Sequence, residues 1–289
     1  MKPPAFHYHD PRTLAEVVGL LGQCENAKLL AGGQSLMPML NMRYVLPDDV
    51  IDLNKVEELS FLREAGNALE IGAMTRQREL EFSDSVAKLC PLMREAILHV
   101  GHRQTRNRGT LAGSLCHLDP SAELVSVATA TGAVVHVVGP NGDREISFAD
   151  FPSGYMMPAI AMDELVTKVR FPCWPAGHGF AFVEFARRHG DFAVASVAVL
   201  LEKDESGKIT RAALALGGVA PVPLLMREVE EILIGQTADE ELFRAAGEAC
   251  RKVEALDDAS APAAYRRHLA AILTQRALAL ADTRTKAAA

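Results

Sequence analysis

The sequence predicts an α+β protein with two domains, and three observations carry this prediction. Strand and helix patterns alternate over the first 175 of the 289 residues. A stretch rich in Pro and Gly, Pro-Cys-Trp-Pro-Ala-Gly at residues 172–177, then interrupts the pattern. Beyond it, three strand patterns precede three helix patterns. We therefore expect one domain over residues 1–175 and a second over residues 176–289.

The first domain opens with a helix, because Thr13 and Glu16 form a capping-box pattern ahead of an apolar stripe. Asn141 and Gly142 signal a hairpin turn. The other expected elements are strands at 28–31, 50–53 and 69–72, a polar turn or helix from Thr75, a helical pattern over 89–97, a basic turn-rich stretch at 102–109, a helix from Ser121, and strands at 133–138 and 164–171.

The second domain has a simpler pattern. Three apolar runs predict its strands, and three segments with helical spacing follow them. The strands are expected at 180–185, 193–201 and 211–219, and the helices at 227–233, 240–246 and 263–280.

The acidic composition argues against nucleic-acid binding. The chain has 37 Asp and Glu against 30 Lys and Arg, whereas a nucleic-acid binder normally shows a basic face. No apolar run reaches the roughly 20 residues that span a bilayer, and the N-terminus lacks the apolar stretch of a signal peptide. We therefore expect a cytoplasmic protein without a membrane span.

The sequence indicates no metal site. The five cysteines are scattered and include no C-x-x-C pair, which excludes an evident zinc or iron–sulfur motif on this chain. The nine histidines show no H-E-x-x-H pattern. His7 and His9 are close together, but two ligands near a terminus do not define a metal site.

Two segments rich in glycine are candidates for anion binding. The first glycine segment, residues 31–36, follows a predicted strand and contains adjacent glycines, where an anion can approach the backbone N–H groups without meeting a Cβ. The second is the loop at residues 110–114, which has a hydroxyl at each end and Gly113 between them; together with the preceding Gly109 it is called the second glycine segment. Together they could clamp a pyrophosphate; singly, each is also compatible with an ordinary turn. Neither matches the Rossmann fingerprint, the phosphate-binding loop or a nucleophile elbow.

Three motifs carry a family resemblance. They are Ala-Gly-Gly-Gln-Ser-Leu at residues 31–36, Arg-Asn-Arg-Gly-Thr-Leu-Ala-Gly-Ser-Leu-Cys-His-Leu-Asp-Pro at 106–120, and Arg-Arg-His-Gly-Asp-Phe-Ala at 187–193. The first two resemble the FAD loops of the medium, flavin-carrying subunits of molybdenum hydroxylases, which include carbon monoxide dehydrogenases and the flavin domain of xanthine dehydrogenase. The third resembles the signature at the start of that family's C-terminal domain.

The resemblance implies a fold that agrees with the predicted boundary. It implies an FAD-binding domain of two α/β subdomains of the vanillyl-alcohol-oxidase type, at about residues 1–60 and 61–175. It also implies a C-terminal domain with a three-stranded antiparallel sheet and helices.

The resemblance also implies site residues. FAD would be bound non-covalently, with no catalytic residue on this chain. Diphosphate contacts are implied at Gly32, Gly33, Gln34, Ser35, Thr110, Gly113 and Ser114, and further cofactor contacts within the same motifs at Ala31, Leu36, Gly109, His117 and Asp119. Glu123 stands where the family usually has an Asp that binds the sugar-alcohol chain of the flavin. Val100, Val166 and Phe192 are implied near the flavin ring.

Two positions depart from the family pattern. Ala112 replaces the first glycine of a Gly-Gly pair, which is tolerated if its φ stays negative. His117 replaces a residue that is small in many relatives. A reactive role for His117 or Cys116 is one alternative, and packing is the favoured one.

The implied role is an electron relay. A large partner subunit would carry the molybdenum cofactor and a small one two 2Fe-2S clusters, commonly in a dimer of heterotrimers. FAD on this chain would pass electrons to an acceptor such as NAD, oxygen or a quinone. The alternatives are a stand-alone FAD oxidase or dehydrogenase and an assembly subunit without flavin. The basic residues 103–108 could face the iron–sulfur subunit, offset diphosphate charge, or form a solvated loop.

Overall fold

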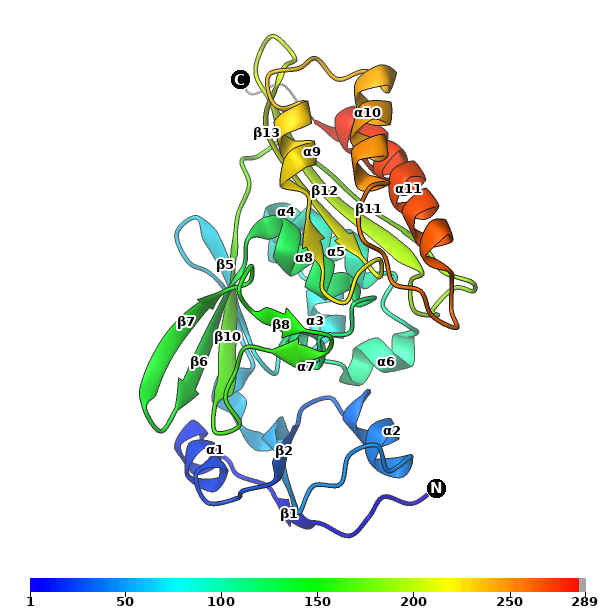
Figure 1. Ribbon diagram of the computed structural model, residues 1–289. Coiled ribbons are helices and arrows are strands. Elements are labelled where there is room, and N and C mark those ends of the chain that lie inside the picture. Colours follow the sequence, from blue (N-terminus) through cyan, green and yellow to red (C-terminus); the bar gives the residue numbers. More distant parts are fainter. Residues whose placement is uncertain (286–289) are drawn as a thin grey trace.

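The computed structural model describes residues 1–285 and places the chain in three successive parts (Figure 1). A small N-terminal unit lies at one end, a central unit of helices and a sheet follows, and the C-terminal sheet and helices lie at the other end. Residues 286–289, the end of the expected second domain, lie outside the described residues. Within residues 1–285, no helix is long and apolar enough to cross a membrane.

The N-terminal unit is a parallel three-stranded sheet with two helices. Its strands β1 (His7–His9), β2 (Ala27–Leu30) and β3 (Asp49–Asp52) are ordered β1-β3-β2. The capping box of Thr13 and Glu16 is confirmed at the start of α1 (Leu14–Leu21), whose Val17 and Leu21 pack against Ile51. Helix α2 (Leu36–Asn41) follows the first glycine segment, and the 3-10 turns η1 (Leu53–Lys55) and η2 (Glu57–Leu59) lead into the central unit.

The central unit has a five-stranded antiparallel sheet of order β4-β5-β10-β6-β7 and a layer of short helices. The predicted hairpin at Asn141 and Gly142 is confirmed, because Gly139 pairs with Gly142. The elements are β4 (Leu62–Glu64), β5 (Ala68–Gly72), α3 (Gln77–Phe82), α4 (Asp84–Leu89), α5 (Pro91–Ile97), α6 (Arg103–Arg108), α7 (Leu111–His117), α8 (Glu123–Thr131), β6 (Val134–Gly139), β7 (Gly142–Ser147), β8 (Pro152–Gly154), β9 (Met157–Pro158) and β10 (Leu165–Pro172).

The C-terminal part confirms the α+β expectation. Strands β11 (Gly179–Phe185), β12 (Ala195–Lys203) and β13 (Ile209–Gly217) form the predicted antiparallel sheet, and a fourth strand, β14 (Leu224–Leu225), adds two residues at its edge. Helices α9 (Arg227–Leu233), α10 (Glu240–Cys250) and α11 (Ala263–Arg284) follow. One apolar cluster joins the helices to the inner face of this sheet.

The two larger parts are joined by an apolar and ionic contact between α5 and β11. The Glu95 carboxylate accepts a hydrogen bond from the Phe182 N–H at 3.0 Å and pairs with Arg284 at 2.5 Å. Phe182, Ala198 and Leu200 share a buried cluster with residues of α5 and α8. Helix α8 is buried along its whole length, because it lies between the central helices and the C-terminal sheet.

Three expectations about local structure were wrong. The basic stretch at 102–109 is mostly the helix α6, and residues 111–117 form α7 with Thr110 as its N-cap. The helical pattern over 89–97 is interrupted after Leu89, because Pro91 starts a new helix and Cys90 lies between the two. Helix α8 begins at Glu123, two residues beyond the expected Ser121, whose N–H is bonded to the Asp119 carboxylate.

Candidate functional site

The two glycine segments meet in the folded chain. A Cβ placed on Gly32 would lie 2.2 Å from the carbonyl oxygen of Arg108 and 2.9 Å from Cα of Gly109. A Cβ on Gly113 would lie 3.4 Å from Cβ of Ala31. The backbones are therefore in direct contact, and only glycine fits at position 32. Segments about 75 residues apart in sequence form one surface.

The first glycine segment presents a row of backbone donors. Gly33 has φ of 74°, a conformation that favours glycine, and the turn leads into α2 with Ser35 as the N-cap. In the part of the chain that the structure describes, the N–H groups of residues 32–36 donate no intramolecular hydrogen bond. Adjacent unpaired N–H groups beside a helix start are a suitable anion-binding arrangement.

The second glycine segment offers hydroxyl groups instead of backbone donors. The Thr110 hydroxyl oxygen accepts a hydrogen bond from the Gly113 N–H at 3.1 Å. The N–H groups of Leu111 and Ala112 donate to carbonyl oxygens of Thr75 and Ala73. Thr110 Oγ1 can still donate its own proton, and the Ser114 hydroxyl has no partner among residues 1–285. The segment can therefore contact an anion through these two side chains.

Sequence reasoning missed two residues that join the segments. Arg76 donates to the carbonyl oxygen of Arg108 and, at 2.5 Å, to the Asn54 side-chain oxygen. Asn54 in turn donates to the carbonyl oxygen of Ala31 at 2.9 Å. Burial, with the neighbouring Arg108 charge as a second cause, lowers the pKa of Arg76. No motif pattern contains Arg76 or Asn54, so only the fold brings them to the site.

Gly109 is required for the same close packing. A Cβ at this position would lie 2.4 Å from the Gln77 side-chain oxygen. The Gln77 N–H donates to the carbonyl oxygen of Gly109 at 2.9 Å, which fixes the start of α3 against the second segment. Gly32 and Gly109 therefore allow the close contact between the segments. The sequence implied Gly32 as a diphosphate contact and Gly109 as a further cofactor contact, and both remain predictions.

Ala112 fits its position without strain. It is the second residue of α7, it is 6% exposed, and positive φ among the described non-glycine residues occurs only at Arg43, Leu118 and Met156. The departure from Gly-Gly is thus compatible with the helix. Leu118, which ends α7 with φ of 53°, is the residue with unusual backbone in this motif.

The C-terminal signature reaches the same region. A Cβ on Gly190 would lie 2.4 Å from the ring of His102, directly before α6. The Ser121 hydroxyl donates to the carbonyl oxygen of Ala193 at 2.8 Å, and the Gly218 N–H donates to that of Pro120. Phe192 therefore precedes a residue that is bonded to Ser121, directly after the second motif, and its side chain is 69% exposed. The third motif therefore lies beside the residues that flank the second one, and the second motif contacts the first.

An acid–base cluster lies at this junction. His99 Nδ1 is 3.2 Å from Glu184 Oε1, and this contact raises the pKa of His99. Burial raises the pKa of Glu123 to about 8, and the nearby Glu184 charge adds to the effect. Val100 adjoins His99 and its carbonyl oxygen accepts a hydrogen bond from Arg106. Sequence reasoning named Glu123 and Val100 but missed His99 and Glu184.

Three of the implied residues, and the neighbouring Cys116, make contacts within the protein. Val166 is 3% exposed and packs in the main core, so a ligand could reach it only if the core opened. The Asp119 carboxylate accepts from the Ser121 N–H at 2.8 Å. Burial lowers the pKa of His117 and raises that of Cys116 to about 12, so both groups are neutral near pH 7. These pKa shifts favour packing over a reactive role.

The basic stretch divides into two kinds of residue. Arg106 is buried and paired with Glu81 at 2.9 Å, so it fastens α6 to α3. Arg103 and Arg108 are exposed. Of the three arginines in α6, Arg103 and Arg108 are therefore the two available to a partner or to an anion.

The site has the character of a nucleotide-cofactor site. It combines a glycine turn with free N–H groups, a second segment with free hydroxyls, two nearby guanidinium groups and a junction between two domains. These residues fit a diphosphate-containing cofactor. The fold and the site together indicate a chain that binds a nucleotide cofactor.

Comparison with known proteins identifies the family. Residues 4–174 match the FAD binding domain in molybdopterin dehydrogenase, and residues 180–281 match the CO dehydrogenase flavoprotein C-terminal domain. The chain is 35% identical to the carbon monoxide dehydrogenase medium chain of Afipia carboxidovorans, covering 99% of this chain and 100% of that one. It is 37% identical to the nicotine 6-hydroxylase medium subunit of Paenarthrobacter nicotinovorans, with the same coverage.

Solved structures of similar proteins point to the same family. Carbon monoxide dehydrogenase from Hydrogenophaga pseudoflava matches with a TM-score of 0.96 at 36% identity, covering 99% of this chain and 100% of that one. Quinoline 2-oxidoreductase from Pseudomonas putida matches with a TM-score of 0.94 at 34% identity, covering 98% and 99%. The chain belongs to the FAD-binding medium subunits of molybdenum hydroxylases. It is an oxidoreductase subunit with FAD as its cofactor, which confirms the family, fold class and cofactor expected from the sequence.

Proposed function

We propose that this chain is the electron-transfer subunit of a heterotrimeric molybdenum hydroxylase. It would receive electrons from the 2Fe-2S clusters of a small subunit and pass them to an external acceptor, while a large subunit with the molybdenum cofactor oxidises the substrate. The observation that supports this proposal most is the contact between the two glycine segments, because it creates one anion-binding surface from two distant motifs.

The diphosphate is proposed to lie on the first glycine segment. The N–H groups of residues 32–36 and the Ser35 hydroxyl would donate from one side, and the hydroxyls of Thr110 and Ser114 from the other. Each hydrogen bond to a charged oxygen contributes about 1.5–3 kcal/mol. Arg76 holds the two sides together and, with Arg108, adds positive charge to an otherwise acidic chain.

The flavin end is proposed to lie toward the domain junction. Val100 and Phe192 supply apolar surface there, and Glu123 is the acid proposed to bind the sugar-alcohol chain. Its raised pKa means that it can donate as well as accept near neutral pH. His117 and Asp119 are proposed as supports of the second motif, and Val166 as a core residue behind it.

The proposed electron-relay role rests on the chemistry of FAD and on the absence of a cysteine cluster among residues 1–285. FAD, when bound, can accept electrons singly and release them in pairs. The chain would hold it between two domains, whose boundary we place near residue 175. Its five free cysteines are at separate positions, so the iron–sulfur clusters are assigned to a partner. We propose a cytoplasmic dimer of heterotrimers; the names of two relatives, a medium chain and a medium subunit, support the presence of other subunits.

Spectroscopy and reconstitution test the proposal. The purified chain should carry non-covalent FAD in a 1:1 ratio, yet should not oxidise substrates of the relatives, such as CO or nicotine, until co-expressed small and large subunits are added. Substrate oxidation by the chain alone would favour a stand-alone flavin enzyme. Colourless protein that still assembles would favour an assembly subunit without flavin.

A further inference from the structure

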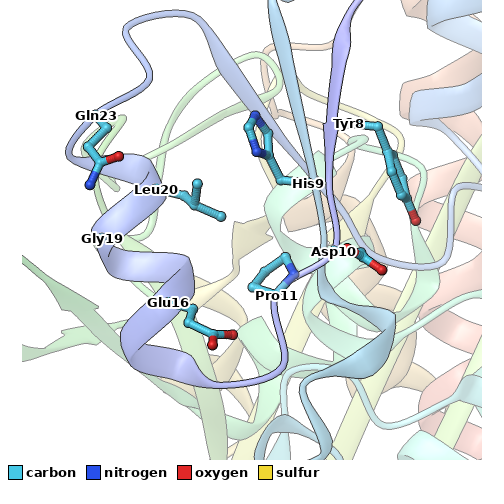
Figure 2. Close-up of a pocket in the computed structure, with 8 residues that line it drawn as sticks. All are labelled: Tyr8, His9, Asp10, Pro11, Glu16, Gly19, Leu20 and Gln23. Carbon is cyan, nitrogen blue, oxygen red and sulfur yellow. The ribbon is translucent and has the colours of Figure 1, made fainter.

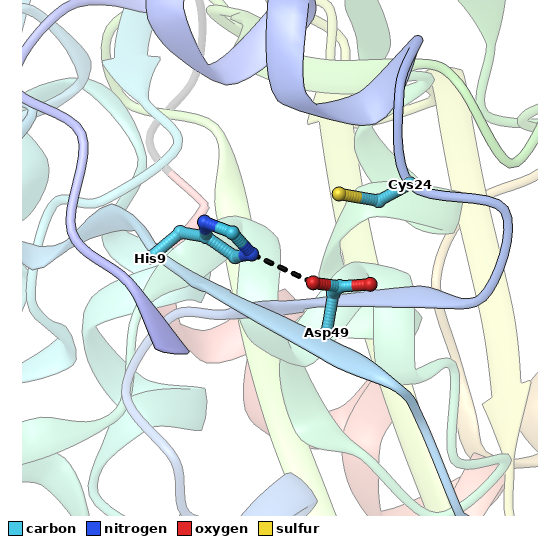
Figure 3. Close-up of side chains that lie close together, drawn as sticks. All are labelled: His9, Cys24 and Asp49. Atoms are coloured by element: carbon cyan, nitrogen blue, oxygen red, sulfur yellow. Dashed lines mark hydrogen bonds and ion pairs between the residues drawn. The ribbon is translucent and has the colours of Figure 1, made fainter. Parts of the chain in front are cut away.

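A cluster of three potential metal ligands lies on the N-terminal unit, away from the three motifs. His9 Nε2 lies 2.7 Å from Asp49 Oδ1, and the Cys24 thiol completes a group whose ligand atoms all lie within 4.8 Å of one another (Figure 3). His9 comes from β1, Asp49 from β3, and Cys24 from the turn between α1 and β2. Three separate elements therefore direct an imidazole, a carboxylate and a thiol to one point.

Strand register explains why a fourth ligand is close. Residues two apart on a strand face the same side, so His7 and His9 share a face of the sheet. β1 runs parallel to β3 with His7 opposite Asp49, which places His7 Nδ1 3.9 Å from Asp49 Oδ1. His7 is exposed and can turn its ring toward the cluster.

Solvent can reach the cluster. A groove of about 470 Å³ lies between β1 and α1, and His9 is one of its lining residues (Figure 2). The side chain of His9 is 29% exposed and that of Asp49 16%. A hydrated cation can therefore approach His9 from this groove.

We propose that His9, Cys24 and Asp49 form a Zn²⁺ site, with His7 as the fourth ligand. Zn²⁺ is bound in proteins by thiolate sulfur, imidazole nitrogen and carboxylate oxygen, commonly with four ligands in tetrahedral arrangement. Bond lengths of about 2.0–2.3 Å place neighbouring ligand atoms about 3.3–3.7 Å apart, so side-chain adjustments of about 1 Å convert the cluster into a closed site. A hard cation such as Mg²⁺ would not favour the sulfur.

The role of such a site is to fasten the N-terminal unit. The ion would tie the edge strand β1 and the turn before β2 to the central strand β3. The first glycine segment directly follows β2, and the site contains none of the residues proposed to bind FAD. Zinc binding and FAD binding can therefore be tested separately.

Calorimetry with chelator-treated full-length chain tests the site. Titration with ZnCl₂ should show one Zn²⁺ per chain, and Cys24→Ala should weaken binding at least tenfold. Cys173→Ala, which removes another partly exposed thiol, is the matched control and should bind like the wild type. Absence of saturable 1:1 binding by the wild type would overturn the proposal, as would equal affinity in Cys24→Ala.

A second measurement needs no variant and so does not depend on how Cys24→Ala folds. Maleimide labelling followed by peptide mass spectrometry reports the reactivity of each cysteine in the wild type. Zn²⁺ should slow labelling of Cys24 at least tenfold and leave Cys173 unchanged. Equal labelling of Cys24 with and without Zn²⁺ would overturn the site, whatever the FAD content of the chain.

Discussion

The substitution Gly32→Ala should release FAD by separating the two glycine segments. The new Cβ would lie 2.2 Å from the Arg108 carbonyl oxygen, and ordinary van der Waals contact begins at 3.4 Å. The obstacle is backbone, which Arg76 also holds in place, so a side-chain rotation cannot relieve it. The segments must move apart by about 1 Å, which is enough to break hydrogen bonds to a shared diphosphate.

The size of the effect follows from the bonds lost. One hydrogen bond to a charged phosphate oxygen contributes about 1.5–3 kcal/mol, and each 1.4 kcal/mol corresponds to about a tenfold change in affinity. Loss of a single bond therefore weakens FAD binding by about 10- to 150-fold, and loss of several removes FAD during purification. The expected product is a folded, colourless chain.

Two measurements on matched variants decide this prediction. The FAD-to-protein ratio comes from the absorbance spectrum, and the dissociation constant from titration of apoprotein with FAD. Gly19→Ala on α1 is the control, because a Cβ there meets nothing within 4 Å. Circular dichroism checks that both variants fold. Wild-type FAD affinity in Gly32→Ala would refute the reasoning, since the contact between segments would then be irrelevant to binding.

Three further predictions concern the same region. In the apoprotein, Glu123 has a pKa of about 8 against an ordinary value of 4.5, so the folded state holds a proton that the unfolded chain releases. Stability, measured as the melting temperature, should therefore fall as the pH rises from 4.5 through 8. Glu123→Gln should reduce this fall, whereas the control Glu241→Gln, at an exposed position, should not. Thr110→Val removes the N-cap of α7 and should lower the free energy of unfolding by about 1–2 kcal/mol in urea denaturation, with Thr110→Ser close to wild type. Ala112→Gly should lower the free energy of unfolding by about 0.5–1 kcal/mol and leave the FAD content unchanged. A marked loss of FAD would show that the Ala112 methyl group is part of the binding surface.

Local signals predicted most of the fold. Periodic apolar runs gave the long strands β10 to β13 and the helices α9 and α11 closely, and a capping box located α1. Failures came where short elements lack such signals. Helix α6 is six residues long and rich in charge, and it is held by tertiary contacts such as the buried Arg106–Glu81 pair. Strand β14 has two residues and is defined by its pairing with β13.

The parts of the candidate site that have local sequence motifs were predictable, and the parts that depend on tertiary contacts were not. The glycine segments are visible as local motifs, and their contact is explained by Gly32 and Gly109. Arg76, Asn54 and His99 carry no pattern of their own, because their roles depend on hydrogen bonds across 22 or more residues or on contact with another domain. His9, Cys24 and Asp49 are likewise scattered, so the sequence showed only two neighbouring histidines.

A crystal structure of the chain reconstituted with FAD tests the central claim most directly. The account predicts both phosphate groups within hydrogen-bond distance of the N–H groups of residues 32–36 and of the Thr110 and Ser114 hydroxyls, with the flavin toward Val100 and Phe192. FAD bound elsewhere on the chain, or glycine segments separated by the cofactor, would contradict it.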